Sequence, residues 1–346
     1  MQTTGAAAPP PTAEGTPPSP AAIFDCLHAF QHSYALKAAI DLDLFTVIAE
    51  GAATVEAAAA RCGGSARGVR ILCDGMAMLG FLTKSEDGRY ALTPDSALFL
   101  ARTSPAYVGT TADFLLAPDQ MKSYESLADI IRHGKPDVGG LAPEHPMWVT
   151  FARSMAPMMA MPAQLLAGLL DVAHGGPMKV LDVAAGHGLF GIAVARQNPQ
   201  AEIVAADWAP VLEVARENAA KAGVSDRYRM RPGNALTGDL GSGYDLVLLT
   251  NFLHHFSEAD CTTFLTKIRT VLRDGGRVAA LEFVPDENRL TPPVAARFSL
   301  TMLAATPGGD AYTFGQYRRM FGDAGFRDIG LRPLPPSFER VVTGVR

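Results

Sequence analysis

The sequence predicts a doubly wound α/β fold in the second half of the chain and a mostly helical winged-helix region in the first half. From residue 178 onward, short apolar segments alternate with helical segments, the pattern of a mainly parallel sheet covered by helices. A glycine-rich loop follows the first of these apolar segments. Between residues 23 and 92, several helical segments are followed by a small hairpin. Two such regions suit a chain of 346 residues.

Composition divides the chain into four segments. Residues 1–20 consist almost entirely of Ala, Pro, Thr, Gly and Ser, a composition that predicts a disordered tail. Residues 21–104 form the predicted winged-helix region, and residues 178–346 form the α/β domain. Residues 105–177 are expected to be helical and connecting, with breaks at Pro105, Pro118, Pro136, Pro143, Pro146, Pro157 and Pro162.

The elements of the winged-helix region are predicted from apolar spacing and capping residues. The first helix carries an apolar face made by Ile23, Leu27, Phe30 and Tyr34. Separate helices are expected at residues 35–42 and 44–50. Thr54 and Ser65 are expected to cap two further helices. These span residues 55–61 and 66–79, and a hairpin of residues 81–84 and 89–92 follows.

The elements of the α/β domain follow the same reasoning. Strands are expected at residues 179–184, 202–206, 227–231, 244–251 and 277–284, with two more near the C-terminus. The helices between them are expected at residues 189–197, 210–222 and 257–272. Thr313 and Gln316 form a capping box that opens the last helix, which is expected to end near Gly325.

Charge and apolar patterning exclude several classes of protein. The net charge is −5, and residues 21–104 contain seven basic and nine acidic residues, so DNA binding by the winged-helix region is disfavoured. No apolar run approaches the roughly 18–20 residues of a membrane-spanning helix, and no secretory signal is recognisable. We therefore expect a cytoplasmic protein that binds neither nucleic acid nor membrane. The four cysteines are expected to be buried free thiols.

The loop LDVAAGHGLFG raises the question of which nucleotide-like ligand it holds. Gly186, Gly188 and Gly191 satisfy the G-x-G-x-x-G pattern of dinucleotide-binding proteins, which is weak evidence for NAD. Asp207, at the end of the second strand, is placed to accept hydrogen bonds from a ribose in either NAD or S-adenosylmethionine. Asp182 discriminates better than Asp207, because a carboxylate beside the loop favours a ligand with an ammonium and a sulfonium over a pyrophosphate.

Six motifs along the chain support S-adenosylmethionine as the ligand of this loop. LDVAAGHG, AADWAPVLEVARENA, GNAL, LHHFSEADC, LRDGGRVAALE and TPGGDAYTFGQY resemble those of class I S-adenosylmethionine-dependent methyltransferases. From about residue 21, the chain resembles the small-molecule O-methyltransferases of the acetylserotonin and caffeate type. The resemblance implies a Rossmann-like methyltransferase domain, S-adenosyl-L-methionine as cofactor, and a homodimer formed through the N-terminal winged-helix domain. The implied cofactor-binding residues are Asp182, Ala184, Gly186, Gly188, Asp207, Trp208, Asn234, Ala235 and Asn251.

The resemblance also places the reaction centre. His254, in LHHFSEADC, takes the position of the catalytic histidine, and Glu282 matches a carboxylate that orients it. A second family acid would fall at Ala311, which has no carboxylate. Three outcomes are therefore open: His254 works with Glu282 alone, the acceptor is acidic enough to need little help, or the chemistry is not O-methylation. No metal is expected, because nothing matches zinc-ligand spacing.

The predicted function is methyl transfer to a hydroxyl of a small aromatic or polyketide-like metabolite, with His254 as general base. Alternatives are N- or C-methylation, non-methylating chemistry such as hydroxylation, decarboxylation or rearrangement, and a ligand-sensing winged-helix regulator. The connecting region is expected to contribute to the substrate pocket. That pocket is expected to contain Met155, Met158, Met159, His255, Phe298 and Met302, although the methionines suit an ordinary core equally.

Overall fold

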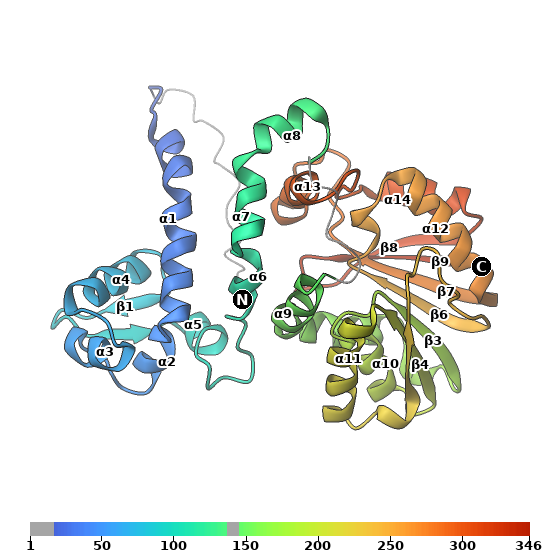
Figure 1. Cartoon of the computed structure of the whole chain (residues 1–346), viewed down its shortest axis with the longest axis horizontal. Coiled ribbons are helices and arrows are strands. Elements are labelled where there is room, and N and C mark those ends of the chain that lie inside the picture. The colour runs from blue at the N-terminus through green and yellow to red at the C-terminus, as the bar shows by residue number, and fades with distance from the viewer. Residues whose placement is uncertain (1–16, 137–144) are drawn as a thin grey trace. The chain divides into compact units, whose positions relative to one another are not determined.

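The computed structural model describes residues 17–136 and 145–346. Most of the predicted disordered tail therefore lies outside the described residues, as does the expected break at Pro143. The contacts divide the chain into two compact units that meet in the sequence between Ala117 and Pro118 (Figure 1). Each unit has its own hydrophobic core, and each is described by itself below.

The N-terminal unit opens with one long helix, α1 (Ala21–Asp41), where two were expected. Residues 21–41 contain no proline or glycine that would end the first helix near Tyr34. The Ala, Leu and Lys residues that follow favour helix, so the helix continues. The helix α2 (Leu44–Ala49) begins after Asp43, which has the left-handed φ of 58°. Five large apolar residues of α1 are exposed: Ile23, Phe24, Leu27, Phe30 and Tyr34.

The remainder of this unit confirms the winged-helix outline. Thr54 caps α3 (Val55–Cys62) and Ser65 caps α4 (Ala66–Met78), each by accepting a backbone N–H bond. The strands β1 (Leu82–Lys84) and β2 (Tyr90–Leu92) pair as an antiparallel hairpin. Two short helices complete the unit: α5 (Pro94–Phe99), which the sequence did not predict, and α6 (Thr111–Leu115), which lies in the region expected to be helical and connecting.

The C-terminal unit is built on a seven-stranded sheet with the order β5-β4-β3-β6-β7-β9-β8. The β9 strand runs antiparallel to β7 and β8, and the other neighbours pair in parallel. This arrangement confirms the doubly wound prediction. The strands are β3 (Met178–Val183), β4 (Ala201–Asp207), β5 (Tyr228–Pro232), β6 (Tyr244–Thr250), β7 (Leu272–Glu282), β8 (Arg327–Pro333) and β9 (Arg340–Val345).

The β7 strand starts earlier than expected, at Leu272 rather than Arg277, because Leu272 already pairs with Tyr244 before the register shifts. It also ends at Glu282 rather than at residue 284. The helices of the unit are α7 (Pro118–Glu125), α8 (Leu127–His133), α9 (Met147–Leu169), α10 (Leu189–Gln197), α11 (Ala209–Lys221), α12 (Glu258–Val271), α13 (Pro293–Ala305) and α14 (Phe314–Asp323). The 3-10 turns are η1 (Val172–His174), η2 (Ser225–Arg227) and η3 (Leu253–His255).

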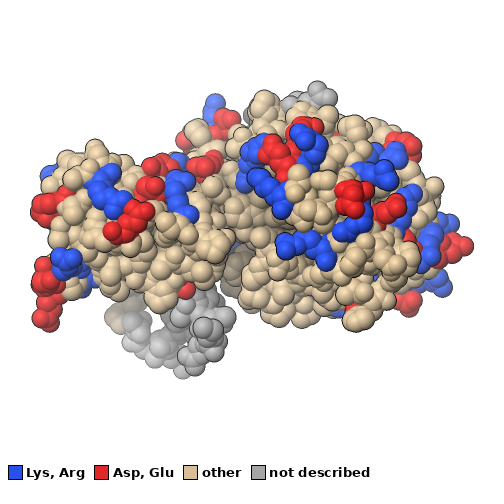
Figure 2. All heavy atoms as spheres, turned by 90° about the horizontal axis from the view of Figure 1, so that it is seen from below, with Lys and Arg blue, Asp and Glu red and all other residues tan. Residues whose placement is uncertain are grey.

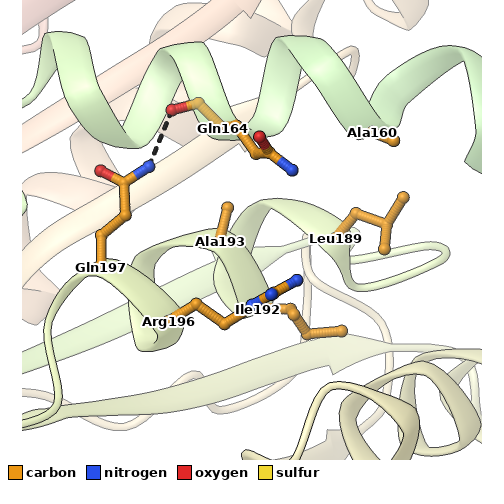
Figure 3. Close-up of a pocket in the computed structure, with 7 residues that line it drawn as sticks. All are labelled: Ala160, Gln164, Leu189, Ile192, Ala193, Arg196 and Gln197. Atoms are coloured by element: carbon orange, nitrogen blue, oxygen red, sulfur yellow. Dashed lines mark hydrogen bonds between the residues drawn. The ribbon is translucent and has the colours of Figure 1, made fainter.

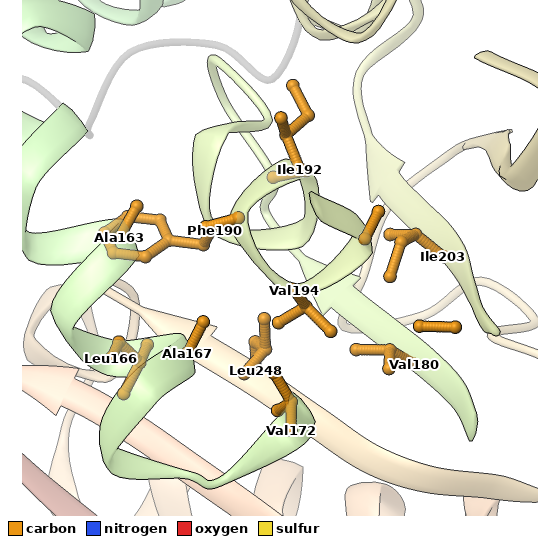
Figure 4. Packing of buried hydrophobic residues seen from close by; sticks show 14 of the residues in the cluster. Ala163, Leu166, Ala167, Val172, Val180, Phe190, Ile192, Val194, Ile203 and Leu248 are labelled. Carbon is orange, nitrogen blue, oxygen red and sulfur yellow. The ribbon is translucent and has the colours of Figure 1, made fainter. Parts of the chain in front are cut away.

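The two faces of the sheet are covered by different helices. The helices α9, α10 and α11 pack on one face, where Val180, Ile203 and Leu248 of the strands meet Phe190 and Leu166 of the helices (Figure 4). The helices α12 and α14 pack on the other face. Because both faces are buried, the carboxyl ends of the parallel strands are left as the accessible edge for a ligand.

The predicted breaks at Pro157 and Pro162 are wrong, since α9 runs through both residues. A proline inside a helix removes one backbone hydrogen bond, but packing of the helix can outweigh that loss. Pro162 is itself buried, and its neighbours Ala163 and Leu166 belong to the main core. Pro118 begins α7 and Pro146 caps α9, so these two prolines do stand at helix boundaries.

The charged side chains give no broad basic surface on the face drawn in Figure 2, where Lys and Arg alternate with Asp and Glu in both units. This distribution agrees with the acidic balance that disfavours DNA binding. Within the described ranges, no helix combines the length and the apolar character needed to cross a membrane.

Candidate active site

The loop between β3 and α10 contains three residues in the left-handed backbone region. Ala184, Gly186 and Gly188 have φ angles of 51°, 57° and 76°. A Cβ added at Gly186 would meet only the carbonyl oxygen of Ala184, at 3.8 Å, so the space beside Gly186 is open. A Cβ at Gly188 would lie 2.7 Å from the Tyr228 hydroxyl and 2.8 Å from the Ala215 Cβ. Gly186 therefore leaves room for a ligand, whereas Gly188 permits close packing inside the protein.

Asp182 is a fully buried carboxyl in β3. Its Oδ2 accepts a hydrogen bond from the Gly191 N–H at 2.9 Å, and its Oδ1 has no partner among the described residues. Burial raises the pKa of Asp182 to about 7, with a further contribution from the charge of Asp207. Gly191 is a packing residue, because a Cβ there would lie 2.7 Å from Ile203 and 2.9 Å from the Asp182 carboxyl. Its match to the dinucleotide pattern therefore has a packing explanation.

Asp207 holds the same loop from the end of β4. Its Oδ2 accepts a hydrogen bond from the Gly186 N–H at 2.8 Å, and its Oδ1 accepts one from the Trp208 N–H at 2.6 Å. Burial raises the pKa of Asp207 to about 6. Each carboxylate oxygen has a second lone pair, so Asp207 can still accept hydrogen bonds from the two hydroxyls of a ribose.

Three other predicted cofactor residues follow the neighbouring strands β4 and β5. Trp208 packs on a small apolar cluster with Trp148 and Val211. Asn234 and Ala235 lie on the loop after β5, and that loop is tied to β4 by the bond from Gly233 N–H to the Asp207 carbonyl at 3.0 Å. The Asn234 Oδ1 accepts from the Leu236 N–H at 2.8 Å, and the Ala235 carbonyl accepts from Lys267 Nζ at 2.9 Å.

These features fit S-adenosylmethionine. The unpartnered Asp182 Oδ1 and the two raised carboxyl pKa values mark a place that lacks positive charge, which a sulfonium and an ammonium would supply. The open space at Gly186 adjoins the Asp207 carboxyl, which accepts from the Gly186 N–H and is placed for the ribose. No feature of the loop offers charge to a pyrophosphate other than the backbone of the helix start.

His254, in the 3-10 turn η3, and Glu282, at the end of β7, form a buried pair. The Nδ1 of His254 lies 2.5 Å from Oε2 of Glu282, and the two residues are only 4% and 0% exposed. The other oxygen, Oε1, accepts from the N–H groups of Phe252 and Leu253 at 3.0 and 2.8 Å. Because a carboxylate only accepts, Nδ1 carries the proton and Nε2 is left as a base. Among the described residues, Nε2 has no hydrogen-bond partner.

Aromatic rings line the imidazole of His254. The ring of Phe298 lies 4.8 Å away, edge to face, and stacks on Phe283 at 4.2 Å. The ring of His255 is 4.4 Å from that of His254, and Trp148 lies edge to face with His255 at 6.3 Å. Burial, together with the neighbouring His254, lowers the pKa of His255 well below its usual value, so His255 is neutral.

The predicted methionines lie on two helices. Met302 is buried one turn after Phe298 on α13, and Met155 and Met159 are buried on α9. Met159 belongs to the main core, and Met158 packs against it, which agrees with the core interpretation. Met159 also reaches the end of β6, where its Sδ lies 3.8 Å from Nδ2 of Asn251. The structure therefore brings Phe298 and His255 to His254 directly, and Met159 to the adjacent strand end.

At the position of the second family acid, Ala311, the segment of residues 309–312 packs closely against the backbone of the turn that carries His254. Ala311 is fully buried, and the neighbouring Asp310 points to Arg289, at 2.9 Å, so it does not serve His254. A Cβ added at Gly309 would collide with the carbonyl oxygen of His254. The hydroxyl of Tyr312 donates to the carbonyl of Phe256 at 2.5 Å. This segment therefore supports the turn that carries His254 without offering it a carboxylate.

Two polar residues near the site escaped sequence reasoning. Glu339, at the start of β9, is 2% exposed, and its Oε1 has no partner among the described residues. His187, in the glycine loop, accepts from the Leu189 N–H at 3.2 Å through Nδ1. Burial lowers the pKa of His187 to about 4. The x position of G-x-G and a lone acid beside a short strand carry no sequence signal, so neither residue could have been singled out.

A separate groove of about 390 Å³ runs between α9 and α10 (Figure 3). Leu189, Ile192 and Ala193 give it an apolar floor, and Gln197 Nε2 donates to the Gln164 carbonyl at 2.9 Å across it. Its lining has no carboxylate or imidazole, and we assign it no part in the chemistry.

Comparison with known proteins decides which family this geometry belongs to. A family model of the O-methyltransferase domain matches residues 124–327, and a model of the O-methyltransferase dimerisation domain matches residues 24–102. The chain belongs to the O-methyltransferase family. This membership confirms the predicted enzyme class and the predicted cofactor of this O-methyltransferase, S-adenosylmethionine.

Three similar proteins illustrate the range of the family. 3-Hydroxy-5-methyl-1-naphthoate 3-O-methyltransferase from Streptomyces sahachiroi is 30% identical over 96% of this chain and 98% of its own. A crystal structure of a candidate O-methyltransferase from Nostoc punctiforme PCC 73102 is 49% identical, with a TM-score of 0.91 over 96% of this chain and 100% of that one. Human N-acetylserotonin methyltransferase in complex with SAM shares the fold, with a TM-score of 0.83 at 22% identity over 97% and 99% of the two chains.

Proposed function

We propose that this O-methyltransferase methylates a hydroxyl of a small aromatic or polyketide-like metabolite, with His254 as general base. The observation that supports the proposal most directly is the pair of His254 Nδ1 and Glu282 Oε2, at 2.5 Å, buried at the carboxyl ends of adjacent strands. The naphthoate substrate named for the Streptomyces sahachiroi relative is an acceptor of the proposed class.

The proton moves from the acceptor to His254. S-adenosylmethionine, when bound, supplies a methyl group on a sulfonium, which leaves as a neutral thioether. The acceptor hydroxyl gives its proton to Nε2 of His254 as its oxygen forms the new bond to the methyl carbon. Glu282 keeps Nδ1 protonated and stabilises the imidazolium that forms. Two backbone N–H bonds fix Glu282 in turn, so the base is oriented before the acceptor arrives.

The donor is held at the neighbouring strand ends. Asp207 would accept hydrogen bonds from the ribose, and Asp182 would supply negative charge beside the cationic tail. Ala184, Gly186 and Gly188 would form the floor of the site. Trp208, Asn234 and Ala235 would surround the adenine. Asn251, which is also predicted to bind the cofactor, is assigned a further role below, because its Oδ1 is buried without a partner at the acceptor edge.

The lining of the reaction centre supports a flat, apolar acceptor. Phe298, Phe283 and the neutral His255 present aromatic surface around His254, and Met302 adds a flexible apolar side chain. None of these groups pairs with the many hydroxyls of a sugar. With Ala311 in place of an acid, a phenol is better suited than an aliphatic alcohol, because its oxygen gives up a proton more easily.

The test is a panel of phenols, hydroxynaphthoates and aliphatic alcohols, with release of S-adenosylhomocysteine and the methylated product both measured. We expect turnover with phenolic acceptors and a fall in kcat of about 10²–10⁴-fold in His254→Ala. Unchanged turnover in that variant would contradict the role of His254. A methylated product that keeps its free hydroxyl would instead indicate C-methylation.

We also propose a homodimer formed through residues 21–104, with residues 105–177 as a connecting region that contributes to the acceptor pocket. The dimerisation-domain match and the exposed apolar residues of α1 support this assignment. Sedimentation should give a dimer for the native chain and a monomer for Leu27→Asp combined with Phe30→Asp. A native chain that sediments as a monomer would contradict it. The location of the protein in the cell stays a prediction.

A further inference from the structure

The sheet brings three polar side chains to one edge behind the reaction centre. The β6 strand ends just before Asn251, β7 ends at Glu282, and the antiparallel β9 begins just after Glu339. These strands are neighbours in the order β6-β7-β9, and the Cα of Glu282 pairs with that of Arg340. Asn251 is joined to β7 by its N–H bond to the Leu281 carbonyl at 2.9 Å. The three residues therefore lie at the same edge of the sheet although they are far apart in sequence.

Two buried oxygens at this edge have no hydrogen-bond partner among the described residues: Oε1 of Glu339 and Oδ1 of Asn251. Hydrogen bonding from the Asn251 side chain acts to lower the pKa of the Glu339 carboxyl, so the two groups are neighbours, while Oε1 of Glu339 and Oδ1 of Asn251 keep no partner of their own. The other Glu339 oxygen, Oε2, accepts from the Ser337 hydroxyl at 3.0 Å. The remaining contact of the Asn251 amide is Nδ2 with the Met159 sulfur at 3.8 Å, and a thioether is a weak acceptor.

The charges around Glu339 disfavour its ionised form. Glu282 and His254 are the charged or titratable groups whose fields reach it, and Arg340 beside it is paired with Asp286 at 2.7 Å. Burial raises the pKa of Glu339, and the nearby carboxylate of Glu282 adds to the rise. Hydrogen bonds from Asn251 and Ser337 and the field of His254 act in the opposite direction. Glu282 is also buried, but its carboxylate accepts from two backbone N–H groups and from His254, whereas Glu339 has no such set of donors and burial favours its neutral form.

We propose that Glu339 is a neutral acid that pairs with the Asn251 amide, and that this pair positions the turn carrying His254. A carboxylic acid and a primary amide can each both donate and accept a hydrogen bond. A single proton on Oε1 of Glu339 therefore makes that oxygen a donor and gives Oδ1 of Asn251 a hydrogen bond to accept. The Glu339 hydroxyl donates to the Asn251 oxygen, and the amide N–H donates to the Glu339 carboxyl. The inference rests on the proposed function of His254.

The pair acts where the turn is least regular. Asn251 has the left-handed φ of 54°, three residues before His254, and its conformation sets the direction of the chain as it leaves β6. Glu282 accepts from the N–H groups of Phe252 and Leu253. The Glu339–Asn251 pair holds the side chain of Asn251, the residue before them. Glu339 thus supports His254 from the residue before β9, whereas Ala311, which has no carboxylate, lies between α13 and α14. It is a positioning residue, because it acts through Asn251.

Infrared difference spectra of the full-length protein, native minus Glu339→Gln, test the protonation directly. We expect the carbonyl stretch of a protonated carboxylic acid at neutral pH in the native protein and its loss in the variant. A carboxylate band in its place would overturn the inference. This readout does not depend on activity, so a failure of the His254 proposal, seen as full turnover in His254→Ala, is a distinguishable result.

Kinetics test the positioning role. Glu339→Gln keeps a donor and an acceptor for Asn251, so we expect kcat within about threefold of native and an unchanged Kd for S-adenosylhomocysteine. Glu339→Leu removes both bonds, and we expect kcat to fall by about tenfold or more with that Kd again unchanged. Equal loss in both variants, or none in Glu339→Leu, would contradict the proposal. If Glu339→Leu does not fold, the Gln variant and the infrared spectra still decide.

Discussion

The two halves of the active site are built differently. The donor edge, formed by Asp182 and Asp207 at the ends of β3 and β4, holds two carboxyls with raised pKa values and no cation. The acceptor edge, formed by His254 and Glu282, already pairs a carboxylate with an imidazole and with two N–H groups. We infer that the carboxyls of the donor edge obtain their balancing positive charge from the bound cofactor, whereas the hydrogen bonds of the acceptor edge form without a ligand.

The largest expected effect is at the acceptor edge. Glu282→Gln puts an NH2 group in place of one carboxylate oxygen. One oxygen accepts from two backbone N–H groups and the other from His254, so one set of donors loses its partner. We expect kcat to fall by about 10²–10⁴-fold, with the Kd for S-adenosylhomocysteine changed less than about threefold. Glu217→Gln, at an exposed ion pair with Arg153, is the matched control and should leave both values unchanged. A large loss of cofactor affinity in Glu282→Gln would show that the two edges are not separate.

The next effect is at the donor edge. Asp207→Ala removes the acceptor of the ribose hydroxyls and of the Gly186 N–H. Because hydrogen bonds to a charged acceptor are strong, we expect affinity for S-adenosylhomocysteine to fall by about 10²-fold in calorimetric titration. Asp226→Ala, on an exposed turn, serves as the control. Unchanged affinity in Asp207→Ala would place the ribose elsewhere.

Two glycines allow a matched comparison of packing at the two edges. Gly191→Ala and Gly309→Ala each add a Cβ where there is no room, and we expect each to lower the free energy of unfolding by about 1–3 kcal/mol. The added Cβ at Gly309 presses on the His254 carbonyl, so kcat should fall more there than in Gly191→Ala, whose Cβ presses on the Asp182 carboxyl at the donor edge. Gly75→Ala in α4, where the Cβ meets nothing, should be neutral or stabilising in chemical denaturation. Equal kcat values in the Gly191 and Gly309 variants would contradict this difference.

The smallest expected effect is the number of protons released when the cofactor binds. In the ligand-free protein, Asp182 and Asp207 are partly protonated at pH 6.5, since their pKa values are about 7 and 6. A cationic ligand favours the ionised forms, so binding of S-adenosylmethionine releases protons, and its affinity rises with pH through this range. Calorimetry in buffers of different ionisation enthalpy should give a fraction of a proton released, and less for S-adenosylhomocysteine, which lacks the sulfonium. Proton uptake would reverse the sign and contradict the account.

Much of this architecture could be predicted from local sequence. Caps at Thr54, Ser65 and Thr313 and the alternation of apolar strands with helices gave the elements close to their observed bounds. The prediction failed where tertiary packing outweighs local preference, as in α9, which continues through Pro157 and Pro162 because that helix is held against the core. The bounds of α6, α7 and α8 within the expected helical region and the helix α13 could not be predicted, because no side chain caps α6, α8 or α13, whereas α5 was missed although Thr93 and Ser96 form a capping box.

The candidate site divides in the same way. Residues inside the motifs, such as Asp207 and His254, could be selected because their position after a strand predicts which edge they occupy. Glu339 could not, since its place beside Glu282 depends on the pairing of β7 with an antiparallel β9 more than fifty residues later. The rejection of Asp310 as a second acid also needed the structure, which shows it paired with Arg289.

Hydrogen–deuterium exchange of the full-length protein, with and without S-adenosylhomocysteine, tests the central claim most directly. The account predicts that the ligand slows exchange in residues 184–191, at the donor edge. It also predicts that the Phe252 and Leu253 amides, bound to Glu282, are already protected without it. Rapid exchange of those two amides until the ligand is added would show that the acceptor edge is assembled by the cofactor, and would contradict the account.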